Sequence, residues 1–396
     1  NLGTPGAANS GTTEIPAPTV TGLRHSPAVP TSSDAVIITA RVDSAMPLTS
    51  VRVRHRLDNT AGDNAWGMTV MADGGSNGDE IAGDGIYTAT LAQYQGNNSV
   101  VQFYVEATSG GGVSRQPTRA PERPALWVVD NSSVPSDLRT QRFVISERSL
   151  NALGGAGESG SFDFAFPRLS NHYFNATFIS NEQDIIYNCE LRKSGSPWTR
   201  SGGSNLSRAK WKTPGDRRFR GYSKRAIDSD AGGGRPYHNR IIRYWLYLFG
   251  HPANENEFVR VIVNGGNADL REDVEPNAND FLKRNWEDGQ LGELYRIDDE
   301  WWFEDDWSRD NRNADWSYKD TDEPERYHAE WIKRSRETEY DYSSFVNWVK
   351  AVGENDFTRD EIERMADIDM MAANAVVRGW CDAWDPDVKI GQVKVQ

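Results

Sequence analysis

The segment from Tyr237 to Tyr295 constrains the fold more than any other part of the chain, because its apolar pattern changes from helical to strand spacing within one short run. Large apolar residues first recur three and four positions apart, which predicts an amphipathic helix with one buried face. These residues are Ile241, Ile242, Trp245, Leu248 and Phe249. Gly250 and Pro252 then end the helix, because glycine adopts a left-handed cap and proline cannot continue a helix. A β-branched run follows and ends at Asn264-Gly265, which predicts a strand and a tight two-residue hairpin turn.

The strand that returns from this turn carries Glu272, and a short helix and a further strand are expected after it. A carboxylate at such a position can pair with a lysine and direct it toward a phosphate, as an ion pair does in protein kinases. The alternative is a solvated glutamate on an exposed strand. Spacing alone leaves both interpretations open.

The net charge argues against a nucleic-acid partner, and the hydropathy argues against a membrane-spanning segment. The 396 residues carry a formal net charge of −14, whereas a nucleic-acid backbone is bound through clustered Lys and Arg. No run of about eighteen apolar residues occurs, so no segment is expected to span a membrane.

The chain starts at Asn1 rather than Met, from which we expect a processed chain that is exported and lies outside the cell or at its surface.

The two cysteines, Cys189 and Cys381, are too few for a disulfide scaffold and lack the close spacing of a zinc site. They form either one bridge or two unrelated buried thiols. Sequence alone does not decide between these alternatives.

Composition changes along the chain predict a multidomain protein. Residues 1–20 are rich in Gly, Pro, Ser and Thr, which is typical of a flexible leader or linker. Short strand-like runs bounded by turn residues recur through residues 21–130, which predicts an all-β sandwich of immunoglobulin or fibronectin type III character. Helical and strand patterns mix in residues 131–396, which predicts an α+β domain.

One loop of the predicted sandwich has the spacing of a calcium site. Asp73, Asn77, Asp79 and Asp84 lie at positions one, five, seven and twelve, and Gly78 lies at position six. In a twelve-residue calcium loop, oxygen ligands recur at odd positions and a glycine at position six permits the sharp turn. The alternative is a glycine-rich hairpin loop whose aspartates favour turn geometry.

Several segments of the α+β region resemble the CotH family of atypical, secreted kinase-like proteins. They are IIYNCELRKSGSPWTR, SRAKWKTPGDRRFRGYSK, the helix, strand, turn and strand around Glu272, and GWCDAWD. The resemblance covers most of residues 138–385, and the GDEIAGDGIY loop before it resembles loops of extracellular sandwich domains that precede CotH modules. The family implies an atypical kinase fold that uses ATP with Mg²⁺ or Mn²⁺ to phosphorylate Ser or Thr of surface or coat proteins.

The resemblance implies a nucleotide-binding role for five residues. Arg192, Gly195 and Ser196 match the family's strand and glycine-serine turn, and Lys210 or Lys212 matches the lysine that reaches the phosphates. From the residues alone, a glycine-serine turn also serves to reverse the chain. A basic strand is also common at the exposed edge of a sheet.

The resemblance further implies that Glu272 orients the lysine, that Asp382 is the base or substrate-orienting carboxylate, and that Asp385 is a lesser candidate that would hold metal. In the family, an Asn-rich strand and a Trp-Asp-x-Asp motif whose aspartate holds the metal follow this loop, and we expect this chain to lack that C-terminal part. From this we expect either a non-catalytic protein or assembly with a separate C-terminal fragment or other subunits. The non-catalytic alternative is an extracellular scaffold in a surface, coat or matrix assembly.

Between the predicted hairpin and the last helices lies a segment dense in Asp, Glu and Trp. Its tryptophans are Trp301, Trp302, Trp307 and Trp316. These rings either dock onto their own domain or form a platform for sugar rings or a partner protein.

Overall fold

The structure is a computed structural model in which the chain forms two compact units. It describes residues 15–59, 64–91, 96–135, 137–154, 171–195, 206–228, 237–287, 293–297, 300–303, 309–312, 317–328, 330–353 and 358–381. The first unit comprises Asn1–Ser223 and Phe258–Arg271, and the second comprises Lys224–Glu257 and Glu272–Gln396. The boundary therefore runs through two strands, β14 (Asn256–Val263) and β15 (Asp269–Val274).

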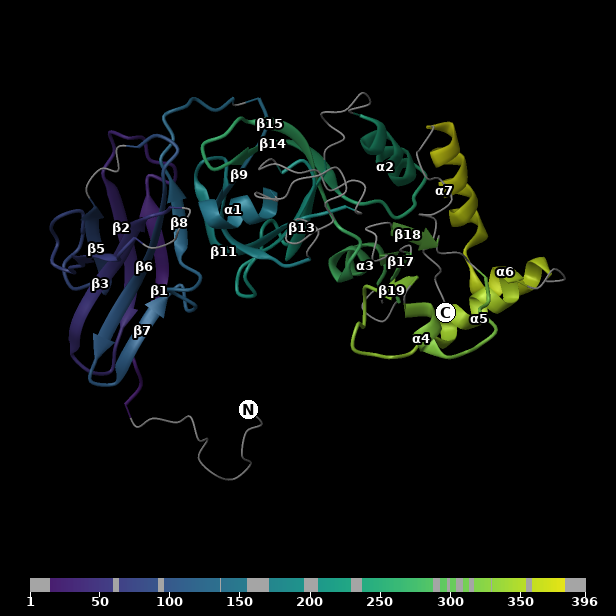
Figure 1. The fold of residues 1–396 in the computed structure, drawn as a ribbon, viewed down its shortest axis with the longest axis horizontal. Helices are drawn as coiled ribbons and strands as arrows, with labels where there is room; N and C mark the ends of the chain where they lie inside the picture. The colour runs from purple at the N-terminus through teal and green to yellow at the C-terminus, as the bar shows by residue number, and fades with distance from the viewer. Residues whose placement is uncertain are drawn as a thin grey trace. The chain divides into compact units, whose positions relative to one another are not determined.

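The first unit begins with two antiparallel sheets (Figure 1). One has the order β1 (Thr19–Ser26), β2 (Val36–Asp43), β5 (Ile86–Leu91). The other has the order β4 (Gly67–Val70), β3 (Leu48–Leu57), β6 (Val100–Ser109), β7 (Gly112–Gln116), and β8 (Ala125–Val128) pairs with β6. Apolar side chains of both sheets, among them Ile38, Leu91, Phe103 and Trp127, form one core. The all-β prediction for this region is confirmed.

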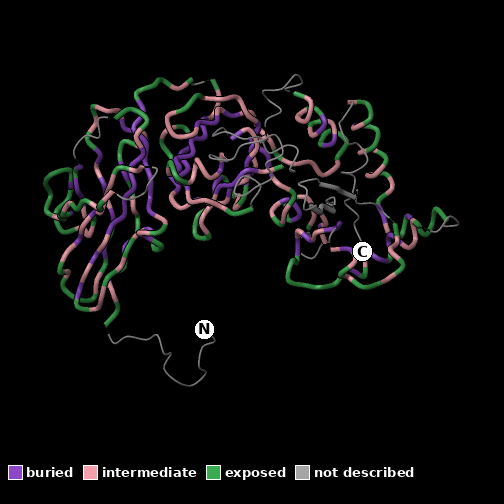
Figure 2. Tube along the Cα trace, viewed as in Figure 1, coloured by how far each residue is buried: buried purple, intermediate pink, exposed green. Residues whose placement is uncertain are grey.

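The same unit continues with strands that follow the N-terminal sheets. They are β9 (Thr140–Ile145), β10 (Phe174–Ser180), β11 (Asp184–Lys193) and β12 (Ala209–Lys212), with helix α1 (Glu147–Gly154) after β9. Neighbouring strands pair antiparallel in the order β9, β10, β11, β12, and residues 260–263 of β14 pair parallel with β9. Phe178 stacks on Trp211 with ring centroids 4.3 Å apart, and Phe143 packs against both rings. Strand β9 is buried along its whole length, and Figure 2 shows buried residues alternating with half-buried ones in this region.

The N-terminal sheets share a second core with β9, β10 and β11. Val100, Leu126 and Val128 pack there against Val144 and Ile179. A buried hydrogen bond crosses the same junction, in which the Leu126 amide donates to Thr177 Oγ1 at 3.0 Å. The first unit therefore continues past residue 130 without a break in its interior.

A buried histidine also lies at this junction. His25 of β1 is 1% exposed, and its Nδ1 lies 2.7 Å from the hydroxyl of Tyr187 in β11. The His25 amide donates to the same hydroxyl at 3.0 Å, and Nε2 lies 2.9 Å from the carbonyl oxygen of Ala28. Burial lowers the pKa of His25 to about 4. The ring is therefore neutral at physiological pH.

Arg142 of β9 is the centre of a buried ion network in the first unit. Its guanidinium donates to Asp130 at 2.8 Å, to Glu182 at 2.7 Å and to the carbonyl oxygen of Asn264. Burial raises the pKa of Asp130, but hydrogen bonds from Ser132 and the charge of Arg142 outweigh it, so the pKa lies below its usual value. The network joins the end of the N-terminal sheets to the turn after β14.

The turn after β14 differs from the two-residue hairpin that the sequence predicts. The Gly266 amide donates to the Val263 carbonyl at 2.9 Å and Asn264 has a φ of 52°, but β15 begins only at Asp269. The turn differs because Asn264 is bound by residues that lie far away in the sequence. The Asn264 side chain accepts from the Ile145 amide at 2.8 Å and donates to the Ile145 carbonyl at 3.1 Å, while its own carbonyl accepts from Arg142. These bonds hold Asn264 against β9 rather than in a minimal turn.

The second unit combines short strands with most of the helices. Strand β13 (Lys224–Asp228) pairs with β15. Strand β16 (Tyr295–Ile297) pairs with β19 (Trp331–Lys333), and β17 (Glu300–Phe303) pairs with β18 (Arg309–Arg312). Its helices are α2 (His238–Leu248), α3 (Asn279–Asn285), α4 (Pro324–His328), α5 (Ser343–Gly353), α6 (Arg359–Met365) and α7 (Ile368–Trp380). The α+β prediction is confirmed in this unit.

An aromatic core holds β19 and helices α4 to α6 together. Tyr327, Trp331, Phe345 and Trp348 are each at most 3% exposed there. Helix α6 starts with the capping box that its sequence pattern indicates, in which Thr358 and Glu361 bond reciprocally. Among the described residues, no helix is long and apolar enough to cross a bilayer.

Both cysteines are free thiols, so the disulfide alternative is wrong. Cys189 is fully buried in β11, and Cys381 is half-buried directly after α7.

Candidate functional site

Helix α2 ends in the way the sequence predicts. Gly250 has a φ of 74°, its amide donates to the Tyr247 carbonyl at 2.9 Å, and the His251 amide donates to the Leu246 carbonyl at 2.9 Å. These two bonds make a Schellman cap, for which a glycine in the left-handed region is favoured. The cap fixes the direction in which the chain leaves α2 toward β14.

The buried face of α2 is narrower than predicted. Ile242 and Leu246 are buried against Val377 of α7. Ile241, Leu248 and Phe249, which the spacing assigned to the core, are exposed. Because α7 covers only one side of α2, one apolar stripe is packed and another faces solvent.

Glu272 is buried on β15 and bound from two sides. Its Oε1 accepts from Arg243 of α2 at 2.6 Å and from the amide group of Asn256. The carboxylate is only 2% exposed, so the alternative of a solvated strand glutamate is wrong. An ion pair therefore ties the helix to the strand, and its cation is an arginine of α2 rather than the lysine that the sequence predicts.

The next residue, Asp273, has a similar environment on the opposite face of the strand, because successive side chains alternate. It is fully buried and accepts from Arg225 of β13 at 2.9 Å. Two neighbouring carboxylates thus each bind an arginine. Arginine suits buried ion pairs because its guanidinium always stays charged and donates several hydrogen bonds in one plane.

Helix α7 connects α2 to the segment that holds the predicted catalytic aspartate. His238 Nε2 bonds to the carbonyl oxygen of Cys381, and the rings of Trp245 and Trp380 lie 5.5 Å apart. Arg378 bonds to Asn374 at 3.0 Å, and its burial and the charge of Arg243 hold its pKa below the usual range. The residue before Asp382 is therefore anchored to α2.

Asp382 and Asp385 themselves lie outside the described residues. Ser196 of the predicted glycine-serine turn lies outside them as well. Their roles remain predictions.

A cavity of about 600 Å³ opens beside α2 in the second unit. Residues of α2, the chain between α2 and β14, and Arg284 of α3 line it. They are Tyr237, Arg240, Ile241, Arg243, Tyr244, Tyr247, Ala253, Asn254, Glu255, Asn256 and Arg284. Its volume falls within the range of about 300–1,000 Å³ that is typical of small-molecule sites.

The other predicted phosphate-binding residues lie in the first unit. Lys212 of β12 is 3.5 Å from Glu190 and 4.0 Å from the centre of the Tyr173 ring, and Lys210 is half-buried in the same strand. The register of β11 and β12 sets Lys212 opposite Glu190 and Lys210 opposite Arg192. The pairing of either lysine with Glu272 remains a prediction.

Arg192 and Gly195 keep the local geometry that the sequence indicates. Arg192 is buried and donates to Asn171 at 2.9 Å. Gly195 follows β11 with a φ of 113°, a conformation that favours glycine. The strand therefore ends at Lys193 and a bend follows at Gly195, while the rest of the predicted turn lies outside the described residues.

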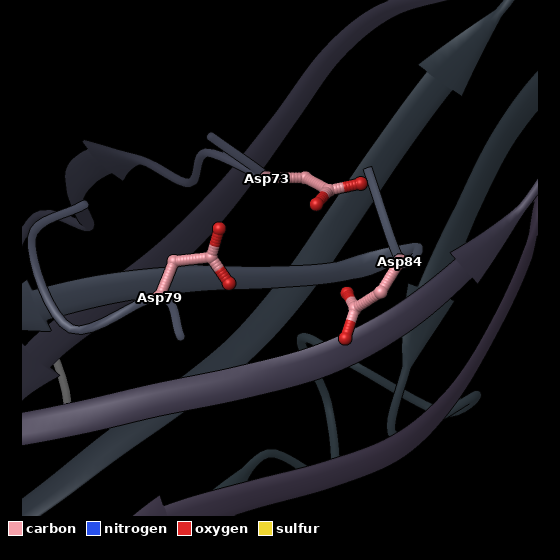
Figure 3. A group of neighbouring side chains, drawn as sticks. All are labelled: Asp73, Asp79 and Asp84. Carbon is pink, nitrogen blue, oxygen red and sulfur yellow. The ribbon is translucent and has the colours of Figure 1, made fainter. Parts of the chain in front are cut away.

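In the calcium-like loop, three carboxylates converge. Oxygen atoms of Asp73, Asp79 and Asp84 all lie within 4.8 Å of one another, and Figure 3 shows the three side chains pointing into a common space. Calcium–oxygen distances of about 2.3–2.6 Å place two ligands of one ion at most about 5 Å apart. The donor set thus fits a calcium ion in size and in chemistry.

Backbone amides hold this loop in shape. Gly75 donates to Asp79 and Gly83 donates to Asp73, each at 2.6 Å. Asn77, the fourth predicted ligand, has a φ of 57°, and its carbonyl accepts from Thr90 at 2.9 Å. Three of the four predicted residues therefore come together through their side chains, and Asn77 shapes the turn.

Sequence reasoning missed Arg243 and Asn256 as the partners of Glu272. One signal was available, because α2 carries Arg240 and Arg243 three positions apart and has no acidic residue. A helix with cations on one face and no acid of its own indicates a carboxylate on the neighbouring element.

Comparison with protein-family models gives a match for residues 207–390, to the family described as CotH kinase protein. No curated protein matches the chain significantly. A solved structure titled "Crystal structure of Br derivative BhCBM56" is 9% identical and covers 26% of this chain and 89% of that one, with a TM-score of 0.15. Another, "Titin kinase and its flanking domains", is 8% identical and covers 66% of this chain and 37% of that one, also with a TM-score of 0.15. Scores this low do not establish a shared fold.

Proposed function

Because residues 207–390 belong to the CotH kinase protein family, we propose that this CotH-like chain binds ATP with Mg²⁺ or Mn²⁺ and phosphorylates serine or threonine of surface, coat or matrix proteins. In that step the acceptor hydroxyl oxygen bonds to the γ-phosphorus, the bond from the γ-phosphorus to the β–γ bridging oxygen breaks, and ADP leaves. Asp382 would accept the hydroxyl proton, and Asp385 would hold the metal ion. The proposal places the protein outside the cell or at its surface.

The observation that carries this proposal is the buried pair of Arg243 and Glu272. Protein kinases join a strand to a helix by an ion pair in which the strand supplies lysine and the helix supplies glutamate. Here the strand supplies the acid and the helix supplies the cation. We propose that this inverted pair holds α2 against β15, while Lys210 or Lys212 supplies the charge for the phosphates.

Nucleotide binding is tested by thermal unfolding of the full chain with ATP and Mg²⁺ or Mn²⁺. At a free ligand concentration 100-fold above Kd, binding stabilises the folded state by about 2.7 kcal/mol. We expect a raised Tm for the unaltered chain and for Glu275→Gln, but not for Glu272→Gln. Glu275 is the matched control, because it too is a buried carboxylate bound to one arginine, Arg284.

Phosphoryl transfer is tested separately with labelled ATP and a mixture of candidate acceptor proteins. Asp382→Asn should keep the ATP-dependent rise in Tm and lose the transfer of label, because it alters the proton acceptor rather than the nucleotide contacts. A chain whose Tm does not respond to ATP with either metal would contradict the proposal.

That contrary result would favour the alternative function, a non-catalytic scaffold of a coat, matrix or surface assembly. The pairing of Glu272 with Arg243 is the observation that supports this alternative. The charge of Arg243 already balances that of the buried carboxylate, so a lysine is not needed for this purpose. In that role the CotH region would serve as a rigid structural body.

We also propose that the loop of Asp73, Asp79 and Asp84 binds Ca²⁺. Three carboxylates within 4.8 Å supply hard oxygen donors at a suitable spacing. A bound ion would stabilise the first unit, since a ligand that binds only the folded state raises its stability.

The calcium proposal is tested by the Tm of the chain in EGTA and in increasing Ca²⁺. Ca²⁺ should raise the Tm of the unaltered chain and of Asp43→Asn, an exposed carboxylate outside the loop, but not of Asp79→Asn. Identical unfolding curves in EGTA and in Ca²⁺ would remove calcium from the proposed function.

A further inference from the structure

The outer face of the sheet formed by β4, β3, β6 and β7 carries neighbouring arginines. On β3, Val51 and Val53 belong to the core of the two N-terminal sheets and are at most 3% exposed. Because side chains alternate along a strand, Arg52 and Arg54 lie on the opposite face, about 6.8 Å apart. Both are half-buried. This strand therefore presents two guanidinium groups in a row, on a chain whose net charge is −14.

One acid serves three arginines on this face. The strand register places Glu106 of β6 between Arg52 and Arg115 of β7. Glu106 Oε1 accepts from Arg54 at 3.2 Å, and Oε2 accepts from Arg115 at 2.9 Å. Among the described residues, no carboxylate pairs with Arg52, and its buried Nε has no hydrogen-bond acceptor. The three arginines and one acid leave an excess of two positive charges.

Exposed apolar side chains of the edge strand β4 lie beside these arginines. The register pairs Val70 with Arg52 and Met68 with Arg54, at a strand spacing of about 4.8 Å. Val70 is 65% exposed and Met68 is 47% exposed. We refer to Arg52, Arg54, Arg115, Val70 and Met68 as the arginine face. A ligand that covers it must offer carboxylates and apolar groups within about 5 Å of one another.

The next arginine of β3 is held by its own neighbours. Arg56 Nε donates to Gln102 at 2.9 Å, and its Nη1 donates to the carbonyl oxygen of Asn64 at 3.1 Å. Its guanidinium also lies 4.3 Å from the centre of the Trp66 ring. The arginine face therefore ends at Arg54 along this strand.

We propose that the arginine face binds an acidic segment of a partner protein in which carboxylates lie beside apolar side chains. Arginine binds a carboxylate through two parallel hydrogen bonds, and arginine and methionine are both enriched in protein interfaces. A nucleic acid or an acidic glycan would bind the arginines but would offer no apolar side chains to Val70 and Met68. The net charge of −14 would also repel a long polyanion.

This surface belongs to the first unit, so the proposal does not depend on nucleotide binding by the CotH region. It names one kind of partner for the chain, a protein with acidic and apolar residues side by side. Complementary charge would speed the encounter, and the apolar contacts would slow dissociation.

The test titrates the full chain against a fluorescently labelled random copolymer of glutamate and tyrosine and follows the anisotropy. The copolymer supplies carboxylates beside apolar rings, whereas poly-L-glutamate supplies carboxylates alone. The buffer contains EGTA, so that calcium does not bridge acids of the chain and the polymer. We expect the copolymer to bind at least about ten-fold more tightly than poly-L-glutamate of the same length, because only the copolymer buries Val70 and Met68.

Two pairs of variants test the charge and the apolar contact separately. Arg52→Glu should weaken binding of the copolymer by at least about ten-fold, because it sets a like charge against the acids. Its matched control, Arg41→Glu, makes the same change at an exposed arginine of the other N-terminal sheet and should leave the affinity within about two-fold. Val70→Ser should weaken binding of the copolymer but not of poly-L-glutamate. Val376→Ser, at a valine of α7 that is 64% exposed, should alter neither.

Circular dichroism establishes that each variant is folded, and Arg115→Glu repeats the charge test at a side chain that is 42% exposed. A copolymer that fails to bind would overturn the proposal, as would equal weakening by Arg52→Glu and Arg41→Glu. Polygalacturonate that binds as tightly as the copolymer would assign the arginine face to an acidic glycan and would overturn it as well.

Discussion

The buried network around Arg142 makes a quantitative prediction about the first unit. The Arg142 side chain is 0% exposed and its partner Asp130 is 2% exposed. The substitution Asp130→Ala removes one partner and leaves a guanidinium inside the protein. The remaining carboxylate, Glu182, is 25% exposed and compensates only in part.

The magnitude follows from the cost of an incompletely paired buried charge. Removing one partner of such a pair typically costs 3–5 kcal/mol, and because Glu182 remains, we expect about 3 kcal/mol. In a unit of this size each kcal/mol lowers Tm by about 2–4 °C, so the expected fall is about 6–12 °C. The double substitution of Asp130→Ala with Arg142→Met should lose less than Asp130→Ala alone, because it leaves no buried charge.

Differential scanning calorimetry of the full chain measures both values. The control is Asp137→Ala, which removes an exposed ion pair with Arg260 and should leave Tm nearly unchanged. If Asp130→Ala unfolds at the temperature of the control, or if the double variant is the less stable of the two, the reasoning about the buried charge is refuted.

Two further predictions concern the junction and the end of α2. The first unit should lose up to about 3 kcal/mol of stability as the pH falls from about 6.5 to about 4, because unfolded His25 binds a proton at its ordinary pKa of 6.5 and the folded, buried ring only near 4. His25→Phe should flatten this part of the pH dependence in urea titrations, and an unchanged slope would contradict it. Gly250→Ala should destabilise the second unit by about 1 kcal/mol, because Gly250 has a φ of 74°, a conformation that is unfavourable for a residue with a Cβ. No atom lies within 4 Å of the new Cβ, so a steric clash does not contribute. Gly353→Ala is the control at a helix end without a positive φ, and equal losses of Tm in both variants would show that backbone conformation is not the cause.

Local patterns predicted much of the fold around the candidate site. The order α2, β14, β15, α3 and β16 follows from a change of apolar period and from Gly250 and Pro252, all of which act within a few residues. The aspartates of the predicted calcium loop also come together through local spacing.

The errors arise where distant residues decide the structure. Arg142 and Ile145 bind Asn264 from more than a hundred positions away and replace the predicted minimal hairpin. The packing of Val377 on Ile242 and Leu246 selects which side of α2 is buried. Arg243 as the partner of Glu272 depends on how a helix lies against a strand, which the spacing of apolar residues does not encode.

Because the two thiols have unequal surroundings, one of them can be labelled selectively. Cys189 is fully enclosed in β11, and burial raises the pKa of its thiol, so it forms little of the thiolate that reacts with electrophiles. Cys381 is half-buried, directly precedes Asp382, and its carbonyl is anchored to His238. A maleimide dye should therefore attach at Cys381 alone, where its emission would follow events in the Asp382 segment without any cysteine having to be engineered in or removed.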